Sequence, residues 1–176
     1  MLIWLENFFD RISDYIGYLC SFLMLAMMVN IFYDVFMRYV FKTGSIAFQE
    51  LEWHIFSIII LLGTSYALKE DAHVRVDILY TKFSEKNKAL VNIVGAFLFI
   101  TPIALLIALG SVGFVMEAYN TNEISGDPGG LTHRWLLKAL IPLSFWLLIF
   151  IATGFVIKNI NIYRRETGRL PKVKEQ

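Results

Sequence analysis

The sequence predicts an all-α integral membrane protein with four transmembrane helices, and three observations lead to this prediction. Hydrophobic residues make up 57% of the 176 residues and the mean hydropathy is +0.58, which is more apolar surface than one small soluble core buries. Four apolar runs approach or exceed the length of about 20 residues that a helix needs to cross the hydrocarbon. Basic residues are concentrated in alternate connecting segments. We therefore treat residues 1–176 as a single membrane domain.

The first two apolar runs predict two helices in the N-terminal half. Residues 16–33 are eighteen residues without a charge, and they predict a span over about 15–37. The second span, over about 48–68, has Glu50, Glu52 and His54 in its first turns and is uninterrupted from Ile55 to Leu68. We expect its acidic end to lie at the membrane interface.

The third and fourth runs predict two more helices. Residues 89–116 form an uncharged run of 28 residues, which is roughly 42 Å of helix against a hydrocarbon core of about 30 Å. This span must tilt or protrude, and Pro102 predicts a kink in it. The fourth span covers about 139–158, with Pro142 in its first turn, where proline is tolerated.

The orientation follows from the basic residues beside the spans, because lysine and arginine are retained on the cytoplasmic side. The N-terminal segment, the middle loop 69–88 and the tail 159–176, with Lys158 at its start, hold twelve of them, against four in the other two loops. Both termini are therefore predicted in the cytoplasm, and the loop 117–138 in the periplasm. The acidic residues Glu6 and Asp10 ahead of the first span are unlike a cleaved signal peptide, so we expect the chain to be retained whole.

Two further stretches have the spacing of amphipathic helices. In residues 1–14, Leu5, Phe8, Phe9 and Ile12 fall on one face, which predicts a separate helix lying in the membrane interface. In the middle cytoplasmic loop, residues 76, 79, 80 and 83 repeat the spacing and predict a second, short interfacial helix.

The residues argue against several function classes. Sixteen basic residues against fifteen acidic ones give no basic surface, so we expect no nucleic-acid partner. The single cysteine, Cys20, excludes a thiol pair, and only His54 lies near a span, which argues against a bis-histidine haem. No phosphate-binding loop or hydrolase motif is present. We expect no catalytic residue, cofactor or metal, and no enzyme.

A few polar residues lie near the spans and are the candidates for a functional role. Asn30 and Asn92 are the deepest, and for both we favour a hydrogen bond between helices over a substrate contact. Asp34 and Arg38 are four residues apart, so they either pair as a helix-end anchor or leave Arg38 to bridge to Glu50, to Glu52 or to a partner protein. Trp53 lies beside these carboxylates.

The stretch His73-Val74-Arg75-Val76-Asp77 in the middle loop has two readings. It is either a solvated loop or a surface on which a partner docks, and the first is favoured on composition. We therefore keep His73, Arg75 and Asp77 as candidates for a partner interface or a structural salt bridge.

Several of these residues together resemble a known family. The run 34–41 with Asp34 and Arg38, then Glu50 and Gly63, then residues 73–77, resembles the small membrane subunit, of the DctQ type, of tripartite ATP-independent periplasmic (TRAP) transporters. Segments 129–131 and 138–143 resemble a subgroup of that family. Many relatives have a tryptophan and paired acids where this chain has Phe48-Gln49-Glu50.

The resemblance implies a scaffold in the inner membrane of a bacterium. In that family a large multi-span subunit carries an organic acid by an elevator movement driven by sodium, and a soluble periplasmic protein delivers the substrate. The small subunit would hold the stationary part of the large one, help to dock the binding protein and lie in lipid, while sodium coupling belongs to the partner. Two alternatives stay open from the residues alone: a stand-alone small channel or exporter, with Glu50, Glu52 and His54 at a pore mouth, and a membrane redox subunit.

Overall fold

The computed structural model describes residues 2–70, 80 and 82–168, and within them every regular element is a helix. Four helical stretches are long and apolar enough to cross a membrane: Ile3–Val40, Ile46–Lys69, Glu85–Asn120 and Arg134–Glu166. The predicted all-α fold with four candidate spans is confirmed. The orientation of the termini and the position of the interfacial segments relative to a bilayer stay predictions.

The first helix, α1 (Leu2–Val40), is one continuous helix of 39 residues. Residues 2–14 are helical, as predicted, but they join the apolar run without a break, so the predicted boundary between an N-terminal helix and the first span is absent. The first turns of α1 pack on the last helix of the chain, where the rings of Phe9 and Phe150 lie 4.8 Å apart. Asn161 Nδ2 also donates to Glu6 Oε2 at 2.7 Å. Part of the face that was expected to meet lipid thus meets protein.

The second helix, α2 (Ile46–Lys69), folds back along α1 to form a hairpin. At one end Asn30 Nδ2 donates to the backbone oxygen of Phe48 at 3.0 Å. At the other end Lys69 Nζ lies 2.5 Å from Asp14 Oδ1. Each end of the hairpin is therefore closed by a polar contact. We call the end with Glu50 the outer end and the end with Lys69 the inner end, following the predicted orientation.

The third span is helical from Glu85 to Asn120 but is not a uniform α-helix. It consists of α4 (Glu85–Gly95), the π-helical turn η1 (Ala96–Ile100), α5 (Thr101–Gly110) and α6 (Val112–Asn120). The π-helical turn directly precedes Pro102, which has no N–H to continue the α-helical pattern. Thr101 Oγ1 donates to the oxygen of Ala96 at 2.9 Å within this turn. The helix is therefore irregular just before Pro102, while the kink predicted there stays a prediction.

The last helix, α7 (Arg134–Glu166), is longer than the predicted fourth span at both ends. Because it begins at Arg134, Pro142 lies inside it, and the prediction that this proline occupies the first turn is wrong. The loop between the third and fourth spans is correspondingly shorter than predicted and covers residues 121–133.

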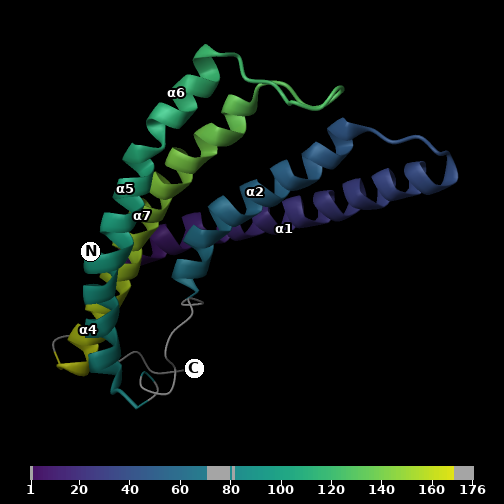
Figure 1. The fold of residues 1–176 in the computed structure, drawn as a ribbon. Coiled ribbons are helices and arrows are strands. Elements are labelled where there is room, and N and C mark those ends of the chain that lie inside the picture. Colours follow the sequence, from purple (N-terminus) through teal and green to yellow (C-terminus); the bar gives the residue numbers. More distant parts are fainter. Residues whose placement is uncertain (1, 71–79, 81, 169–176) are drawn as a thin grey trace.

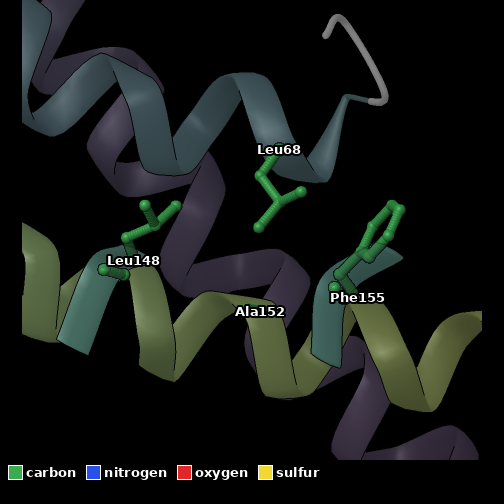
Figure 2. Packing of buried hydrophobic residues seen from close by; sticks show 6 residues of the cluster. Leu68, Leu148, Ala152 and Phe155 are labelled. Carbon is green, nitrogen blue, oxygen red and sulfur yellow. The ribbon is translucent and has the colours of Figure 1, made fainter. Parts of the chain in front are cut away.

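Helix α7 joins the two halves of the molecule. It packs along α4, α5 and α6 and also contacts α1 and α2, so that two helical hairpins cross at the inner end and diverge toward the outer end (Figure 1). The buried apolar cluster lies where they cross (Figure 2). A Cβ on Gly154 of α7 would lie 2.4 Å from Phe9 Cβ, so glycine permits this close approach of α1. The cluster consists of Leu68, Ala96, Ala104, Leu148, Ala152 and Phe155.

Candidate functional site

The carboxylate of Glu50 is the centre of a polar cluster at the outer end. Its residue is 5% exposed, although it lies in the second turn of α2. The hydroxyl of Ser125 donates to Oε1, and the backbone N–H of Leu131 donates to Oε2 at 2.5 Å. Arg134 lies with its guanidinium 3.6 Å from Oε1. Glu50 therefore ties the start of α2 to the loop 121–133 and to the start of α7. We call this arrangement the Glu50 latch.

The conformation of the loop places the Ser125 hydroxyl and the Leu131 N–H beside the carboxylate. Its residues Ser125 and Leu131 also pair through the backbone, since the N–H of Ser125 donates to the oxygen of Leu131 at 3.0 Å. Between them, a Cβ at Gly130 would lie 2.5 Å from Ser125 Cβ and 2.8 Å from Glu50 Oε2. Only glycine lets the loop come this close to the carboxylate, which is why the turn-rich sequence at 125–130 suits this position.

Two cations on neighbouring turns of α7 complete the outer end. Arg134 lies over the Trp53 ring, 5.4 Å from its centroid, and Lys138 lies over the Phe114 ring at 3.8 Å. Lys138 also pairs with Glu123 of the loop. Each cation therefore has an anion and an aromatic face, and the loop is held at both of its ends.

An apolar groove opens beside this cluster, between α2 on one side and α6 and α7 on the other. Its volume is about 470 Å³. Three charged residues line it, namely Arg134, Lys138 and Glu123. We call it the outer groove. Its apolar lining includes Trp53, Phe56, Ile60, Phe114, Leu137 and Ile141.

The other predicted site residues have separate surroundings. Asp34 is 2% exposed and pairs with Arg38 within α1, which confirms the helix-end pair. A bridge from Arg38 to Glu50 or Glu52 is not formed, because Arg134 pairs with Glu50, and among the described residues Glu52 has no hydrogen bond or ion pair. Contact of Arg38 with a partner protein stays a prediction.

Several predictions concern residues that the structure does not describe. His73, Arg75 and Asp77 lie outside the described residues, and so does most of the predicted helix of the middle loop. His54 is described, and its Nδ1 lies 2.6 Å from the backbone oxygen of Glu50, one helical turn earlier. The imidazole of His54 therefore has a hydrogen-bond partner within its own helix.

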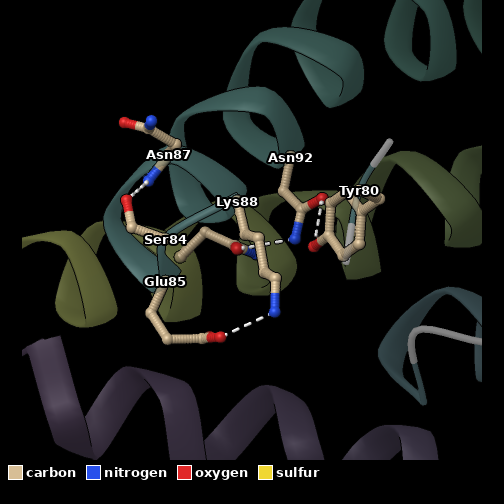
Figure 3. A network of polar contacts seen from close by, with 7 residues as sticks. Tyr80, Ser84, Glu85, Asn87, Lys88 and Asn92 are labelled. Carbon is tan, nitrogen blue, oxygen red and sulfur yellow. Dashed lines mark hydrogen bonds and ion pairs between the residues drawn. The ribbon is translucent and has the colours of Figure 1, made fainter. Parts of the chain in front are cut away.

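The predicted hydrogen bonds of the deep asparagines are confirmed. Asn30 donates to the backbone of α2, as described above, and Asn92 Nδ2 donates to Asn159 Oδ1 at 2.9 Å. Tyr80 in turn donates to Asn92 Oδ1 at 3.2 Å (Figure 3). The amides therefore join helices.

Sequence reasoning missed Arg134 as the partner of Glu50. The two residues are 84 positions apart, and only the turn residues at 125–130 indicated that the intervening loop folds tightly. The cluster is suited to holding helices together, because its charges are paired. Among the described residues, no group of three or more His, Cys, Asp and Glu side chains gathers that could hold a metal ion.

Comparison with known proteins identifies the family. Residues 27–161 match the family model described as tripartite ATP-independent periplasmic transporters, DctQ component. A TRAP transporter small permease protein of Haemophilus influenzae is 29% identical over 79% of this chain and 87% of its own length. A second such protein of that organism is 21% identical over 82% of this chain and 85% of its own length.

In a longer relative, the match covers only a small share of that relative's length. The sialic acid TRAP transporter permease protein SiaT of H. influenzae is 24% identical over 82% of this chain, but the match covers only 22% of SiaT. The family is a transporter permease component and not an enzyme. With its family model matching most of the sequence and four helices able to span a membrane, this chain belongs to the DctQ family, the small permease subunits of TRAP transporters.

Proposed function

We propose that this chain is the scaffold subunit of a sodium-coupled, binding-protein-dependent TRAP transporter that imports an organic acid. Family membership carries the proposal. The match to less than a quarter of SiaT supports a partnership with a larger permease, because one long chain there contains both a segment similar to this one and much additional sequence. Sodium binding and the elevator movement belong to the large subunit.

The surface of the four helices suits a subunit that packs against another membrane protein. Within the most apolar window of α1 only 6% of the residues are buried inside the chain, against 33% in α7. Apolar helix faces in a membrane gain little from burial alone, so association depends on close packing and on shaped surfaces. The outer groove, whose lining includes Arg134 and Lys138, is such a surface. We propose that a helix of the large subunit's stationary part lies in it.

The Glu50 latch supports a static role. It fixes the outer loop, and at the inner end the crossing of α1 and α7 is packed through Gly154. A frame against which an elevator moves needs such fixed ends. We further propose that the outer loop contributes to docking of the periplasmic binding protein, that both termini are in the cytoplasm of a bacterium, and that Trp53, His73, Arg75 and Asp77 contribute to partner contacts.

The first experiment tests the partnership. The tagged chain is co-expressed with a large TRAP permease subunit from the same genome, purified, and reconstituted with and without the binding protein. We expect co-purification in a fixed ratio and sodium-dependent uptake only when all components are present. Uptake by this chain alone would support a stand-alone channel or exporter and would reject the scaffold role.

The second experiment tests the position of the interface. Cysteines are introduced, after replacement of Cys20, at Ile60 in the outer groove and at Leu106 on α5, which is 73% exposed but does not line the groove. Ile60→Cys is expected to form crosslinks to the large subunit with a short bifunctional reagent, and Leu106→Cys is the matched control. Equal crosslinking at the two positions would reject the groove as the interface.

The third experiment tests the orientation. A thiol reagent that does not cross membranes is expected to label Gly126→Cys in intact spheroplasts and to label Thr167→Cys only after lysis. The reverse pattern would overturn the orientation derived from the basic residues.

A further inference from the structure

A small polar cavity lies at the inner end, and none of its lining residues belongs to the Glu50 latch or the outer groove. It lies between α4 and α7, beside the end of α2, and its volume of about 120 Å³ is room for a group larger than one water molecule. Phe155 and Ala89 of the helix faces form part of its wall. Figure 3 shows several of its polar side chains. The polar residues that line the cavity are Lys69, Tyr80, Glu85, Lys88, Asn92, Lys158 and Asn159.

The cavity is rich in unused hydrogen-bond donors. A lysine ammonium has three N–H donors and no acceptor. Lys69 directs its donors to Asp14 at 2.5 Å and to Glu70 at 3.0 Å, and Lys88 directs one to Glu85 at 2.7 Å. These pairs hold both ammonium groups in place, and with the described residues they use two N–H groups of Lys69 and one of Lys88.

Lys158 is the unmatched charge of the cavity. It is half-buried on α7, and among the described residues it has no hydrogen bond or ion pair. Asp10 borders a smaller neighbouring cavity together with Lys158, but the two do not form an ion pair. Within the described part of the chain, all three donors of Lys158 are therefore unused, on a side chain that is partly removed from solvent.

Acceptors in the cavity are already occupied. Asn92 Oδ1 accepts from Tyr80, and Asn159 Oδ1 accepts from Asn92. Glu85 is the one carboxylate among the described residues that line the cavity, and it accepts from Lys88. A ligand that complements this lining accepts hydrogen bonds from several directions, and a negative charge on it would balance Lys158, which has no ion pair among the described residues.

We propose that this inner cavity binds a phosphate-bearing anion, held by Lys69, Lys88 and Lys158 from three different helices. A phosphate presents several oxygens at tetrahedral angles, so one group accepts charge-assisted bonds from donors on separate elements. The cavity also lies at the predicted cytoplasmic end, where basic pockets between membrane helices bind acidic lipid headgroups. The phosphate comes either from such a headgroup or from free phosphate.

The test uses the full chain, purified in detergent and depleted of lipid. The thermal unfolding midpoint is titrated with phosphatidylglycerol in mixed micelles and, in a separate arm, with sodium phosphate. Diacylglycerol, which lacks the phosphate, and sodium acetate at equal ionic strength are the respective controls. We expect the thermal unfolding midpoint to rise saturably with at least one phosphate source and to stay unchanged with the control for that source. Saturation by sodium phosphate identifies free phosphate as sufficient, and a response to the lipid only identifies the headgroup.

Two charge variants on α7 make the test specific. Lys158→Gln is expected to weaken the apparent affinity about tenfold, the effect of losing one charge-assisted hydrogen bond, and Lys158→Arg is expected to restore most of it. Arg164→Gln removes the same charge from an exposed residue outside the cavity and should leave the titration unchanged. The proposal is overturned if neither source gives a saturable rise, if the controls act equally, or if Arg164→Gln weakens binding as much as Lys158→Gln.

Discussion

Replacement of Glu50 by alanine tests whether the outer end is held by this one carboxylate. The substitution removes the acceptor of the Ser125 hydroxyl and of the Leu131 N–H, and it leaves Arg134 without its anion. Because Glu50 is 5% exposed, water does not readily replace the lost acceptor. We expect the loop 121–133 to detach from α2.

The expected loss in the free energy of unfolding can be estimated from the separate contacts of Glu50. Each hydrogen bond to a charged acceptor contributes about 1.5–3 kcal/mol. The Arg134 pair contributes less, about 0–1 kcal/mol, because the two groups are 3.6 Å apart and the arginine side chain is 29% exposed. Allowing for water that enters once the loop detaches, Glu50→Ala should lower the free energy of unfolding by about 3 kcal/mol, and Glu50→Gln by about half as much because one carbonyl acceptor is kept.

The assay combines two measurements on the full chain in detergent micelles. Unfolding by sodium dodecyl sulfate in mixed micelles gives the change in free energy, and limited proteolysis reports cleavage within residues 121–133, which should become faster in Glu50→Ala. The matched control is Glu52→Ala, since Glu52 has no polar partner among the described residues. The reasoning is refuted if Glu52→Ala costs as much as Glu50→Ala, or if Glu50→Ala leaves both measurements unchanged.

Two further substitutions test the inner end by the same unfolding measurement. Gly154→Ala would place a Cβ 2.4 Å from Phe9 Cβ and should lower the free energy of unfolding by about 1–3 kcal/mol. Gly113→Ala, with no neighbour within 4 Å, should lower it little. Equal effects of the two substitutions would contradict the close packing of α1 on α7. Asn159→Ala removes the acceptor of the 2.9 Å bond from Asn92 and should cost about 1–2 kcal/mol, in the range of hydrogen bonds between membrane helices, and an unchanged unfolding curve would show that the bond contributes nothing.

The extent of the helices shows where sequence reasoning reached its limit. Apolar runs predicted the four spans, but α1 and α7 continue well beyond them, to Leu2 and to Glu166. An apolar run marks the part of a helix that hydrocarbon surrounds, whereas a helix continues as long as its backbone bonds and its packing favour it. The first turns of α1 look interfacial in the sequence because their contacts on α7 come from residues about 150 positions away.

Four candidate membrane helices and the resemblance to the DctQ family were predictable from the sequence, and so were Glu50 and Asp34 as candidates, together with Arg38, Glu52, Trp53, His73, Arg75 and Asp77. The spans are visible in runs of neighbouring residues, because a membrane helix forms its backbone hydrogen bonds within its own segment. The pairing of Glu50 with Arg134, and the cavity that Lys158 borders with two other lysines, became visible in the packed helices. Which of these residues come into contact depends on how helices far apart in the sequence pack, and a local sequence pattern does not specify that packing.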